Sequence, residues 1–386
     1  MRFKIEKLFI PIQLIILYFF NIIFSVNSKS KYKFVIGVDE IANITYDLKK
    51  VFGNKSLSIN LSVNKFYITN KYDYAIKSGN KYFLYFKKLF YGPYLLAKLS
   101  NQSDVFIYIW WTGFCVDRKI DYKFLKNKNK KIVCIFLGSD IRSYKLTLNF
   151  HNKHMLDTGL NYISQNINQR ENEARVTKVA KDADEYADLI FNYSKDQMSY
   201  LKSEQFTMPY MYQLKKMCFN KSKFKNIDII KIVHAPSDPI VKGTPLVRAT
   251  IRKLREEGYK FEYIELTNTP NKNVLGILQN THILISQLYA FIPGVLAIEG
   301  MANACATITS AEYDLFPSGA ENAWVKTRYW EIYDNLKYLL DNTEKIEEYA
   351  INGYEFVKNN YTEAKVKEFY YNIFYEHKII DDKIIF

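Results

Sequence analysis

Two segments in the second half of the chain carry residues that could bind a phosphorylated compound. The first is residues 234–245, HAPSDPIVKGTP, which follows an apolar run and precedes a helical pattern. Lys242, in a loop between a strand and a helix, stands beside Gly243, which lets a ligand approach the backbone, and the pair is suited to hold a diphosphate. Thr244 is a good helix N-cap. A solvated loop lysine is the alternative, because a Lys-Gly pair alone is not specific.

The second segment is residues 287–306, QLYAFIPGVLAIEGMANACA. We expect a helix to begin at Gly294, and the free N–H groups of its first turn, at Gly294 and Val295, favour a phosphate. Glu299 follows among apolar residues, where a carboxylate is costly unless it is bonded or used. A carboxylate there can accept both hydroxyls of a ribose, and a structural glutamate that caps a neighbouring backbone is the alternative.

In the first half, residues 37–43 (GVDEIAN) leave the first apolar run and enter a helical pattern. Gly37, Asp39 and Asn43 are therefore candidates for an acceptor-side cleft. The acidic residues here could bind hydroxyls, or they could simply stabilise the start of the helix.

Two further segments of the first half are ambiguous. Asp140 and Arg142, in FLGSDIR, could face a cleft or pair with each other to brace their loop. The aromatic run at residues 110–114 (WWTGF) could stack against a sugar or a lipid, although aromatic residues at a strand end are more often core.

These segments alternate with apolar runs and helical patterns from residue 33 onward, which indicates parallel sheets in doubly wound α/β domains. Expected strands are residues 33–39, 104–110, 131–137, 188–192, 229–234, 261–266, 282–286 and 305–309. Expected helices are residues 40–52, 89–99, 168–187, 245–257, 271–279 and 294–304, with a helical C-terminal part after residue 331.

We therefore expect two Rossmann-like domains that face each other across a cleft. The predicted division is a hydrophobic segment (1–30), an acceptor-side domain (31–212), a linker (213–227), a nucleotide-sugar-binding domain (228–342) and helices that return to the first domain (343–386). Open parallel sheets bind ligands at the carboxyl ends of their strands, so this layout suggests an enzyme that acts on small molecules.

Residues 234–309 resemble the nucleotide-sugar half of GT-B glycosyltransferases, most of all the retaining "glycosyltransferase group 1" family. The resemblance rests on the Lys-Gly pair with its following helix and on AIEGMANACATITS, while residues 136–142 are similar to the family's "HGSD-x-R" loop. It implies that Glu299 binds the ribose and Lys242 the diphosphate, both as catalytic residues, with Gly243, Gly294 and Val295 in the donor site. It also implies retention of the anomeric configuration.

The chain departs from the family pattern at several positions. Phe291 stands where the family carries an acidic residue, and Pro236 stands where it carries an arginine that also binds the diphosphate. Leu137 replaces the histidine of the family's loop. Residues 303–306 lack the Gly and Pro of the family's ribose-binding block. We expect His234, Ser237 and the backbone of Gly294 to compensate. A divergent active enzyme and a pseudo-enzyme with a retained fold both stay open.

Composition narrows the class of protein. The chain has 386 residues and a net charge of +14, with 48% hydrophobic residues and little Gly or Pro, which excludes a fibrous protein and a multi-span transporter. The positive charge favours anionic partners, but no zinc-finger spacing or RNA-binding signature is present, so we expect no nucleic acid. The four scattered cysteines are typical of reduced core residues.

Residues 8–26 (LFIPIQLIILYFFNIIFSV) carry no charge, and basic residues stand on both sides. Three interpretations compete: a cleaved signal peptide, a single membrane span, and an anchor that lies in the membrane interface. We expect membrane association, with the rest of the chain at the cytoplasmic face.

The sequence thus predicts a membrane-associated glycosyltransferase. It would move a sugar from a nucleotide-diphosphate donor, as co-substrate, to a glycan or lipid-linked acceptor in cell-surface polysaccharide synthesis. No metal-binding Asp-x-Asp is evident, so neither a metal nor another cofactor is expected. The first alternative is a non-catalytic GT-B-like binding or scaffold protein at the membrane. The second is a sugar-nucleotide epimerase on the same fold, which would need an acid/base set that is not evident in the sequence.

Overall fold

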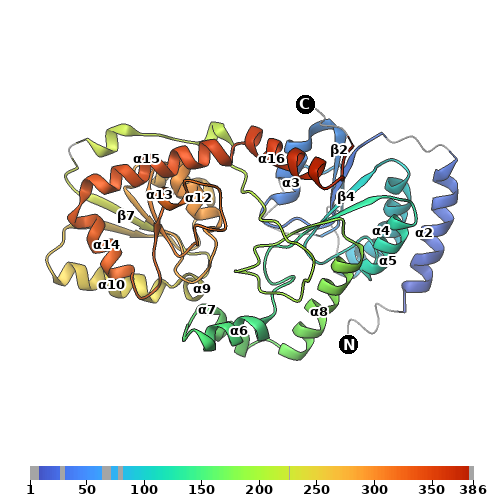
Figure 1. The fold of residues 1–386 in the computed structure, drawn as a ribbon, viewed down its shortest axis with the longest axis horizontal. Helices are drawn as coiled ribbons and strands as arrows, with labels where there is room; N and C mark the ends of the chain where they lie inside the picture. Colours follow the sequence, from blue (N-terminus) through green and yellow to red (C-terminus); the bar gives the residue numbers. More distant parts are fainter. Residues whose placement is uncertain (1–7, 27–30, 63–70, 77–80, 226, 382–386) are drawn as a thin grey trace. The chain divides into compact units, whose positions relative to one another are not determined.

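The computed structural model describes residues 8–26, 31–62, 71–76, 81–225 and 227–381, and the chain forms two compact units (Figure 1). The first unit comprises residues 1–143, 170–208 and 367–386. The second comprises residues 144–169 and 209–366.

The first unit contains a six-stranded parallel sheet in the order β3-β2-β1-β4-β5-β6. Its strands are fully or largely buried, as expected of a parallel sheet covered by helices. The strands are β1 (Phe34–Gly37), β2 (Ser56–Asn60), β3 (Tyr74–Ala75), β4 (Val105–Ile109), β5 (Lys131–Ile135) and β6 (Leu189–Phe191). The helices are α2 (Ile10–Ser25), α3 (Ile44–Phe52), α4 (Lys81–Ser100), α5 (Arg118–Lys126), α8 (Gln169–Tyr186) and the later part of α16 (Glu363–Glu376).

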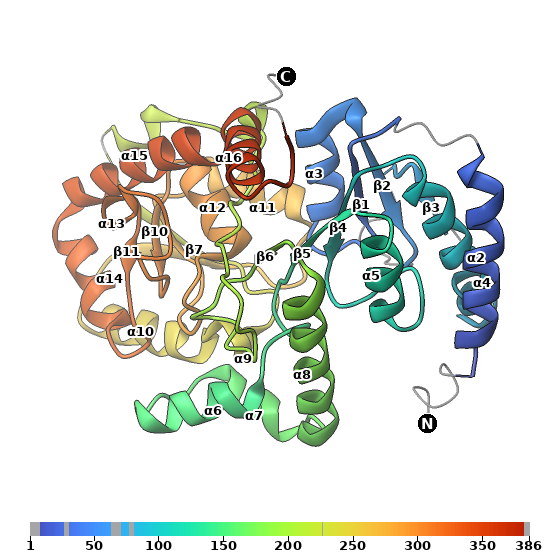
Figure 2. The same ribbon diagram turned by 45° about the vertical axis from the view of Figure 1, so that its right-hand side comes forward.

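The second unit contains a five-stranded parallel sheet in the order β11-β10-β9-β7-β8, with helices around it (Figure 2). Its strands are β7 (Ile230–His234), β8 (Phe261–Glu265), β9 (Ile283–Ile285), β10 (Ala306–Thr309) and β11 (Val325–Lys326). Its helices are α6 (Tyr144–Lys153), α7 (Gly159–Gln165), α9 (Pro239–Lys242), α10 (Thr244–Glu256), α11 (Asn271–Leu278), α12 (Gly294–Ala302), α13 (Ala320–Ala323), α14 (Ile332–Asp341) and α15 (Thr343–Asn360).

The two doubly wound sheets confirm the predicted fold class. Short 3-10 turns, η1 (Gly53–Lys55), η3 (Leu214–Lys216) and η4 (Lys221–Phe224), complete the described elements. Within the described ranges, no helix is long and apolar enough to cross a membrane.

The division into units differs from the predicted boundaries. Residues 144–169, expected in the first domain, group with the second unit, and so does α15. Residues 213–227, expected to be a linker, pack onto the second unit. There Lys223 Nζ donates hydrogen bonds to the carbonyls of Thr281 (2.7 Å) and Asn303 (2.9 Å). These bonds explain why a polar, basic segment is ordered.

Strand β2 was missed by the sequence analysis. Ser56 and Ser58 make this segment polar, yet both are buried. Oδ2 of Asp73 accepts hydrogen bonds from the backbone N–H (2.8 Å) and the hydroxyl (2.9 Å) of Ser58, and the Ser56 hydroxyl donates to the carbonyl of Gly53 (2.8 Å). The Asp73 carboxylate, 15 residues away in the sequence, thus lets the polar Ser58 be buried in a strand.

Helix α15 supports α12 and α13 from behind. A hydrophobic cluster that includes Ile298, Met301, Trp324 and Phe356 joins these helices. Gly353 lies at the closest approach, since a Cβ there would stand 2.8 Å from the carbonyl oxygen of Ala323.

We expect Gly353→Ala to lower the free energy of unfolding of the second unit by about 1–3 kcal/mol, because the added methyl would push α15 off its partners. Gly276→Ala in α11 is the matched control, since a Cβ there meets nothing within 4 Å. It should be neutral or add up to about 1 kcal/mol. Urea unfolding of both variants measures the difference, and equal midpoints would contradict the close packing.

Candidate functional site

The second sheet reverses its winding direction next to β7. From β7 the chain passes to β8 on one side, and β9 then lies on the other side of β7. The loops that follow β7 and β9 therefore leave the carboxyl edge in opposite directions, and ligands of open α/β sheets bind at such a point.

Lys242 stands in the loop region after β7. Asp238 caps α9 by accepting hydrogen bonds from the N–H groups of Ile240 (3.0 Å) and Val241 (3.1 Å). The helix ends at Gly243, whose φ of 80° favours glycine. At this end the half-buried Lys242 donates through Nζ to Oε1 of Gln287, in the loop after β9. This contact spans the point where the sheet reverses.

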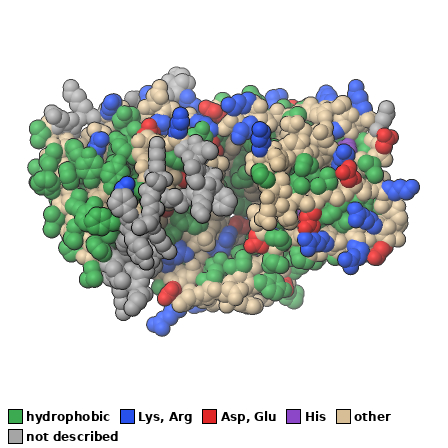
Figure 3. Space-filling view, turned by 180° about the vertical axis from the view of Figure 1, so that it is seen from behind, with side chains coloured by type: hydrophobic (Ala, Val, Ile, Leu, Met, Phe, Trp, Pro, Cys, Tyr) green, Lys and Arg blue, Asp and Glu red, His purple; other side chains and the backbone are tan. Residues whose placement is uncertain are grey.

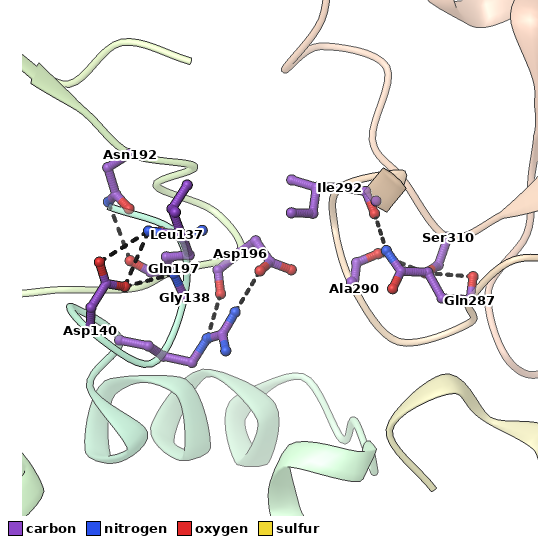
Figure 4. Close-up of polar contacts among 12 residues, drawn as sticks. Leu137, Gly138, Asp140, Asn192, Asp196, Gln197, Gln287, Ala290, Ile292 and Ser310 are labelled. Atoms are coloured by element: carbon purple, nitrogen blue, oxygen red, sulfur yellow. Dashed lines mark hydrogen bonds and ion pairs between the residues drawn. The ribbon is translucent and has the colours of Figure 1, made fainter. Parts of the chain in front are cut away.

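Gln287 organises the loop that leads into α12. Its Nε2 donates to the carbonyl of Ile292, and its backbone carbonyl accepts from Ser310 N (3.0 Å), as Figure 4 shows. Gly294, with φ of 75°, packs against this side chain: a Cβ at Gly294 would stand 3.2 Å from Nε2 of Gln287. The structure therefore brings Lys242 and Gly294 to the same glutamine.

The N-terminus of α12 carries no side-chain cap, because its N-cap residue is Pro293. Gly294 N donates to the hydroxyl of Tyr210 (3.2 Å), and the next residue, Val295, is 51% exposed. The Tyr210 hydroxyl thus takes the first N–H of the helix, and the following N–H groups, from Val295 onward, lie beside a lysine and are suited to an anion.

Glu299 lies on the same helix and is 8% exposed. Its Oε1 accepts a hydrogen bond from Nδ2 of Asn271 (2.8 Å), at the start of α11. Among the described residues, Oε2 has no hydrogen-bond partner. Burial raises the pKa of Glu299, while the Asn271 bond and the charge of Lys216 oppose that rise. A buried carboxylate with one oxygen held and one available can accept hydroxyl groups.

Two predicted donor-site residues lie elsewhere. His234 is fully buried at the end of β7, with Nδ1 at 2.8 Å from the carbonyl of Ile285 and Nε2 at 2.9 Å from Oγ1 of Thr244. Both ring nitrogens are therefore occupied inside the fold, and burial lowers the pKa of the imidazole. Thr244 is not the N-cap of α10, because Gly243 takes that position. Ser237 is exposed in the loop before α9.

Phe291, at the position of an acidic residue in the family that this sequence resembles, makes a cation–π contact with Arg328. The guanidinium of Arg328 is 5.4 Å from the ring centroid and donates to the carbonyl of Ser310 (3.3 Å) and to the carboxylate of Glu312. Since Ser310 also bonds Gln287, Arg328 reaches the loop that Lys242 contacts. Asn271, Gln287 and Arg328 were not predicted, because their places follow from strand order and not from local spacing.

The first sheet has a corresponding reversal between β1 and β4. Thr112, after β4, donates to Oδ2 of Asp39, after β1. Asp39 is 6% exposed, and its Oδ1 has no partner among the described residues. Gly37 precedes it where a Cβ would stand only 2.5 Å from the carbonyl oxygen of Ile59, so only glycine fits.

Asp140 and Arg142 brace loops, but they do not pair with each other. The buried Asp140 carboxylate accepts from the backbone N–H groups of Leu137 and Gly138 (2.7 Å), and burial raises its pKa to about 6. Arg142 binds Asp196, with Nη2 at 2.6 Å from Oδ2. These contacts favour the structural interpretation of both residues.

The remaining candidates of the first unit divide in the same way. Asn43 is exposed and precedes α3 with φ of 66°. Phe114 is core, whereas Trp111 is half-buried beneath the guanidinium of Arg175, 5.3 Å from its ring centroid. Within the described ranges, no group of three or more His, Cys, Asp or Glu side chains could hold a metal ion.

No family model matches the chain, and the search of curated proteins found no match. Solved structures do match. A glycosyltransferase from Rickettsia africae aligns with a TM-score of 0.56 at 12% identity, covering 91% of this chain and 99% of that chain. Sucrose-phosphate synthase from Thermosynechococcus elongatus aligns with a TM-score of 0.50 at 12% identity, covering 78% and 80%.

The chain has the GT-B fold. At this low identity the likeness shows the fold alone. Within this fold, the hydrogen bonds of each candidate residue distinguish two kinds: residues that could contact a ligand and residues whose contacts stabilise the fold.

Glu40 belongs to the second kind. Its carboxylate accepts from the N–H groups of Thr45 (3.2 Å) and Tyr46 (3.0 Å) in the first turn of α3 and from the hydroxyl of Tyr72 (2.9 Å). It is fully buried, and this burial raises its pKa to about 7 despite these donors. Glu40 therefore caps α3.

We expect the stability of the first unit to fall as the pH rises from about 4.5 to about 7. Over this range the unfolded chain loses the Glu40 proton while the folded chain retains it, a difference of at most about 3 kcal/mol. The Glu40→Gln side chain cannot titrate, so this variant should lack the pH-dependent part of the free energy of unfolding that Glu40 causes, even if the substitution also changes the stability as a whole. Chemical unfolding at several pH values compares the two, and identical pH profiles would contradict the raised pKa.

Proposed function

We propose that this chain is a glycosyltransferase that moves a sugar from a nucleotide-diphosphate donor to a glycan or lipid-linked acceptor. One observation carries the proposal. Lys242 and the uncapped start of α12 meet at Gln287, at the reversal point of the second sheet, and Glu299 lies on the same helix. Lys242 and the start of α12 are suited to bind a diphosphate, and Glu299 is suited to bind the hydroxyls of a ribose.

In this proposal Lys242 and the N–H of Val295 bind the diphosphate, and the N–H of Gly294 joins them when the diphosphate displaces the Tyr210 hydroxyl. As the bond between the sugar and the diphosphate breaks, negative charge grows on the leaving nucleoside diphosphate, and these fixed positive groups stabilise it. Arg328, which is paired with Glu312, reaches the loop of Gln287 from the end of β11 and is our candidate for the place of the arginine that Pro236 replaces. We propose that the reaction proceeds without a metal and, by the family resemblance, with retention at the anomeric carbon.

Asp39 is our candidate for a residue that binds the acceptor substrate. Its Oδ1 is buried and has no partner in the part of the chain that the structure describes; it lies at the reversal point of the first sheet, where a sugar hydroxyl could donate to it. We place the reaction at the cytoplasmic side of a membrane, where nucleotide sugars are available, and in cell-surface polysaccharide synthesis.

We expect Lys242→Met to weaken binding of both pyrophosphate and nucleoside diphosphates by about 10- to 100-fold, because a charged hydrogen bond is lost. Isothermal titration with UDP, GDP, ADP and TDP measures this effect. Lys231→Met is the matched control. Lys231 lies at the opposite end of β7, where it pairs with Glu262 at 3.5 Å, so its loss should leave binding within about twofold.

Glu299→Gln should separate ribose from phosphate recognition. Glutamine can still accept from Asn271, so the fold is kept, but it offers one acceptor oxygen fewer. We expect about tenfold weaker binding of nucleoside diphosphates and unchanged binding of pyrophosphate. Equal loss for both ligands would place Glu299 outside a ribose site.

The alternative is a non-catalytic binding or scaffold protein with this fold. Its support is the loss of family residues at Pro236, Leu137 and Phe291. Absence of binding to any nucleotide would favour it, whereas release of nucleoside diphosphate from a nucleotide sugar in the presence of an acceptor would exclude it.

A further inference from the structure

Helix α2 is fastened to the first unit by its polar residues. Gln13 is 1% exposed, and its Nε2 donates to the carbonyl of Leu89 (3.0 Å) in α4. Its Oε1 accepts from the backbone N–H of Val116 (3.0 Å). Within an otherwise apolar helix, this glutamine therefore faces the protein.

A second polar residue fastens the other end. Oδ1 of Asn21 accepts from Nζ of Lys128 (2.7 Å) and from Nδ2 of Asn101 (3.2 Å). Between and beyond these anchors, Leu17 is fully buried, and Phe20 packs edge-on against Tyr94 of α4. Figures 1 and 2 both show α2 alongside α4.

The opposite face of α2 is apolar and exposed. It consists of Leu8, Ile12, Ile15, Tyr18, Phe19, Ile22, Ile23 and Val26, which are 41–80% exposed. Figure 3 shows hydrophobic side chains gathered at this end of the first unit. A helix on a water-exposed surface turns its polar residues outward, so α2 has the reverse arrangement.

We infer that α2 lies in the plane of a membrane interface, with this apolar face buried among the acyl chains and headgroups of anionic lipid. Its 16 residues extend about 24 Å, less than the roughly 30 Å of a bilayer core. Because Gln13 and Asn21 hold it along α4, standing upright in the bilayer would break their hydrogen bonds. A membrane span and a cleaved signal peptide are both incompatible with this role in the fold.

Charge complementarity selects anionic lipid over a second copy of the chain. Arg2, Lys4 and Lys7 precede the helix in the sequence, and Lys29 and Lys31 follow it. Anionic headgroups attract basic residues that come near the surface, at about 1 kcal/mol for each. Pairing of two identical α2 faces would instead bring like charges together.

The inference does not depend on the proposed activity, but it bears on the acceptor. Gln13 bonds Val116, four residues after Thr112, which contacts Asp39. If the proposed function holds, the membrane-facing helix is joined to the loop at the acceptor side of the first sheet, as a lipid-linked acceptor would require.

Flotation of the full chain with vesicles tests the inference. We expect binding to vesicles that contain phosphatidylglycerol and much weaker binding to phosphatidylcholine alone. The double variant Ile15→Glu/Ile22→Glu should lose at least about tenfold in affinity, since two outward isoleucines leave the lipid and two charges enter it. Nucleotide binding by this variant, measured in parallel, reports separately on the proposed function.

Met155→Glu/Leu214→Glu is the matched control. Both residues are exposed apolar residues of the second unit, and the charge change is the same, so vesicle binding should be unchanged. Equal loss in both variants, or no binding of the parent chain to either vesicle, would overturn the inference. So would a dimer in light scattering that only the α2 variant dissociates.

Depth measurement separates an in-plane helix from a span. Single cysteines replace Ile12 or Ile23 in a Cys218→Ser background, where the other three native cysteines are buried. Each is labelled with a fluorophore and read with depth-dependent quenchers in phosphatidylglycerol vesicles. The inference requires equal, shallow depths, whereas a spanning helix would place the two labels about 16 Å apart in depth.

Discussion

One lysine side chain joins the two loops on which the candidate site of the second unit depends. Lys242 follows β7 and Gln287 follows β9, and these strands are the neighbours at which the winding of the sheet reverses. Parallel strands direct every following loop to one edge, and the reversal leaves a gap between two of them. The first sheet has the same constraint, and there Thr112 reaches Asp39 across the gap.

Buried carboxylates in the two units show how the fold uses the same chemistry for different ends. Glu40 accepts three hydrogen bonds from its own unit, two of them from the first turn of α3, which it caps. Glu299 has one hydrogen bond, from Asn271, and Asp39 keeps one buried oxygen without a partner among the described residues. The desolvation that such groups suffer is recovered only when a donor arrives. Number of partners, rather than burial alone, distinguishes a structural acid from a candidate binding group.

Much of this arrangement could be predicted from the sequence. The apolar runs of β7 and β9, each followed by Gly and Pro, predicted both the strands and the loops, so Lys242 and Gly294 could be named. Gln287, Asn271 and Arg328 could not, because their roles arise where segments distant in sequence meet. His234 was misjudged for a related reason. It was expected to help bind the diphosphate, whereas Thr244 and the end of β9 occupy both of its ring nitrogens.

The N-terminal segment illustrates the limit of pattern alone. An uncharged apolar run allowed a signal peptide, a span or an interfacial anchor, and our inference of an interfacial anchor rests on the directions of Gln13 and Asn21. Their inward hydrogen bonds make α2 part of the first unit and leave its apolar residues outside.

A crystal structure of the full chain soaked with an intact nucleotide-diphosphate sugar tests the central claim most directly. The account predicts the diphosphate between Nζ of Lys242 and the first turn of α12, with the ribose hydroxyls on Oε2 of Glu299. A nucleotide bound elsewhere, with Lys242 still on Gln287 and Glu299 still bonded only to Asn271, would contradict it.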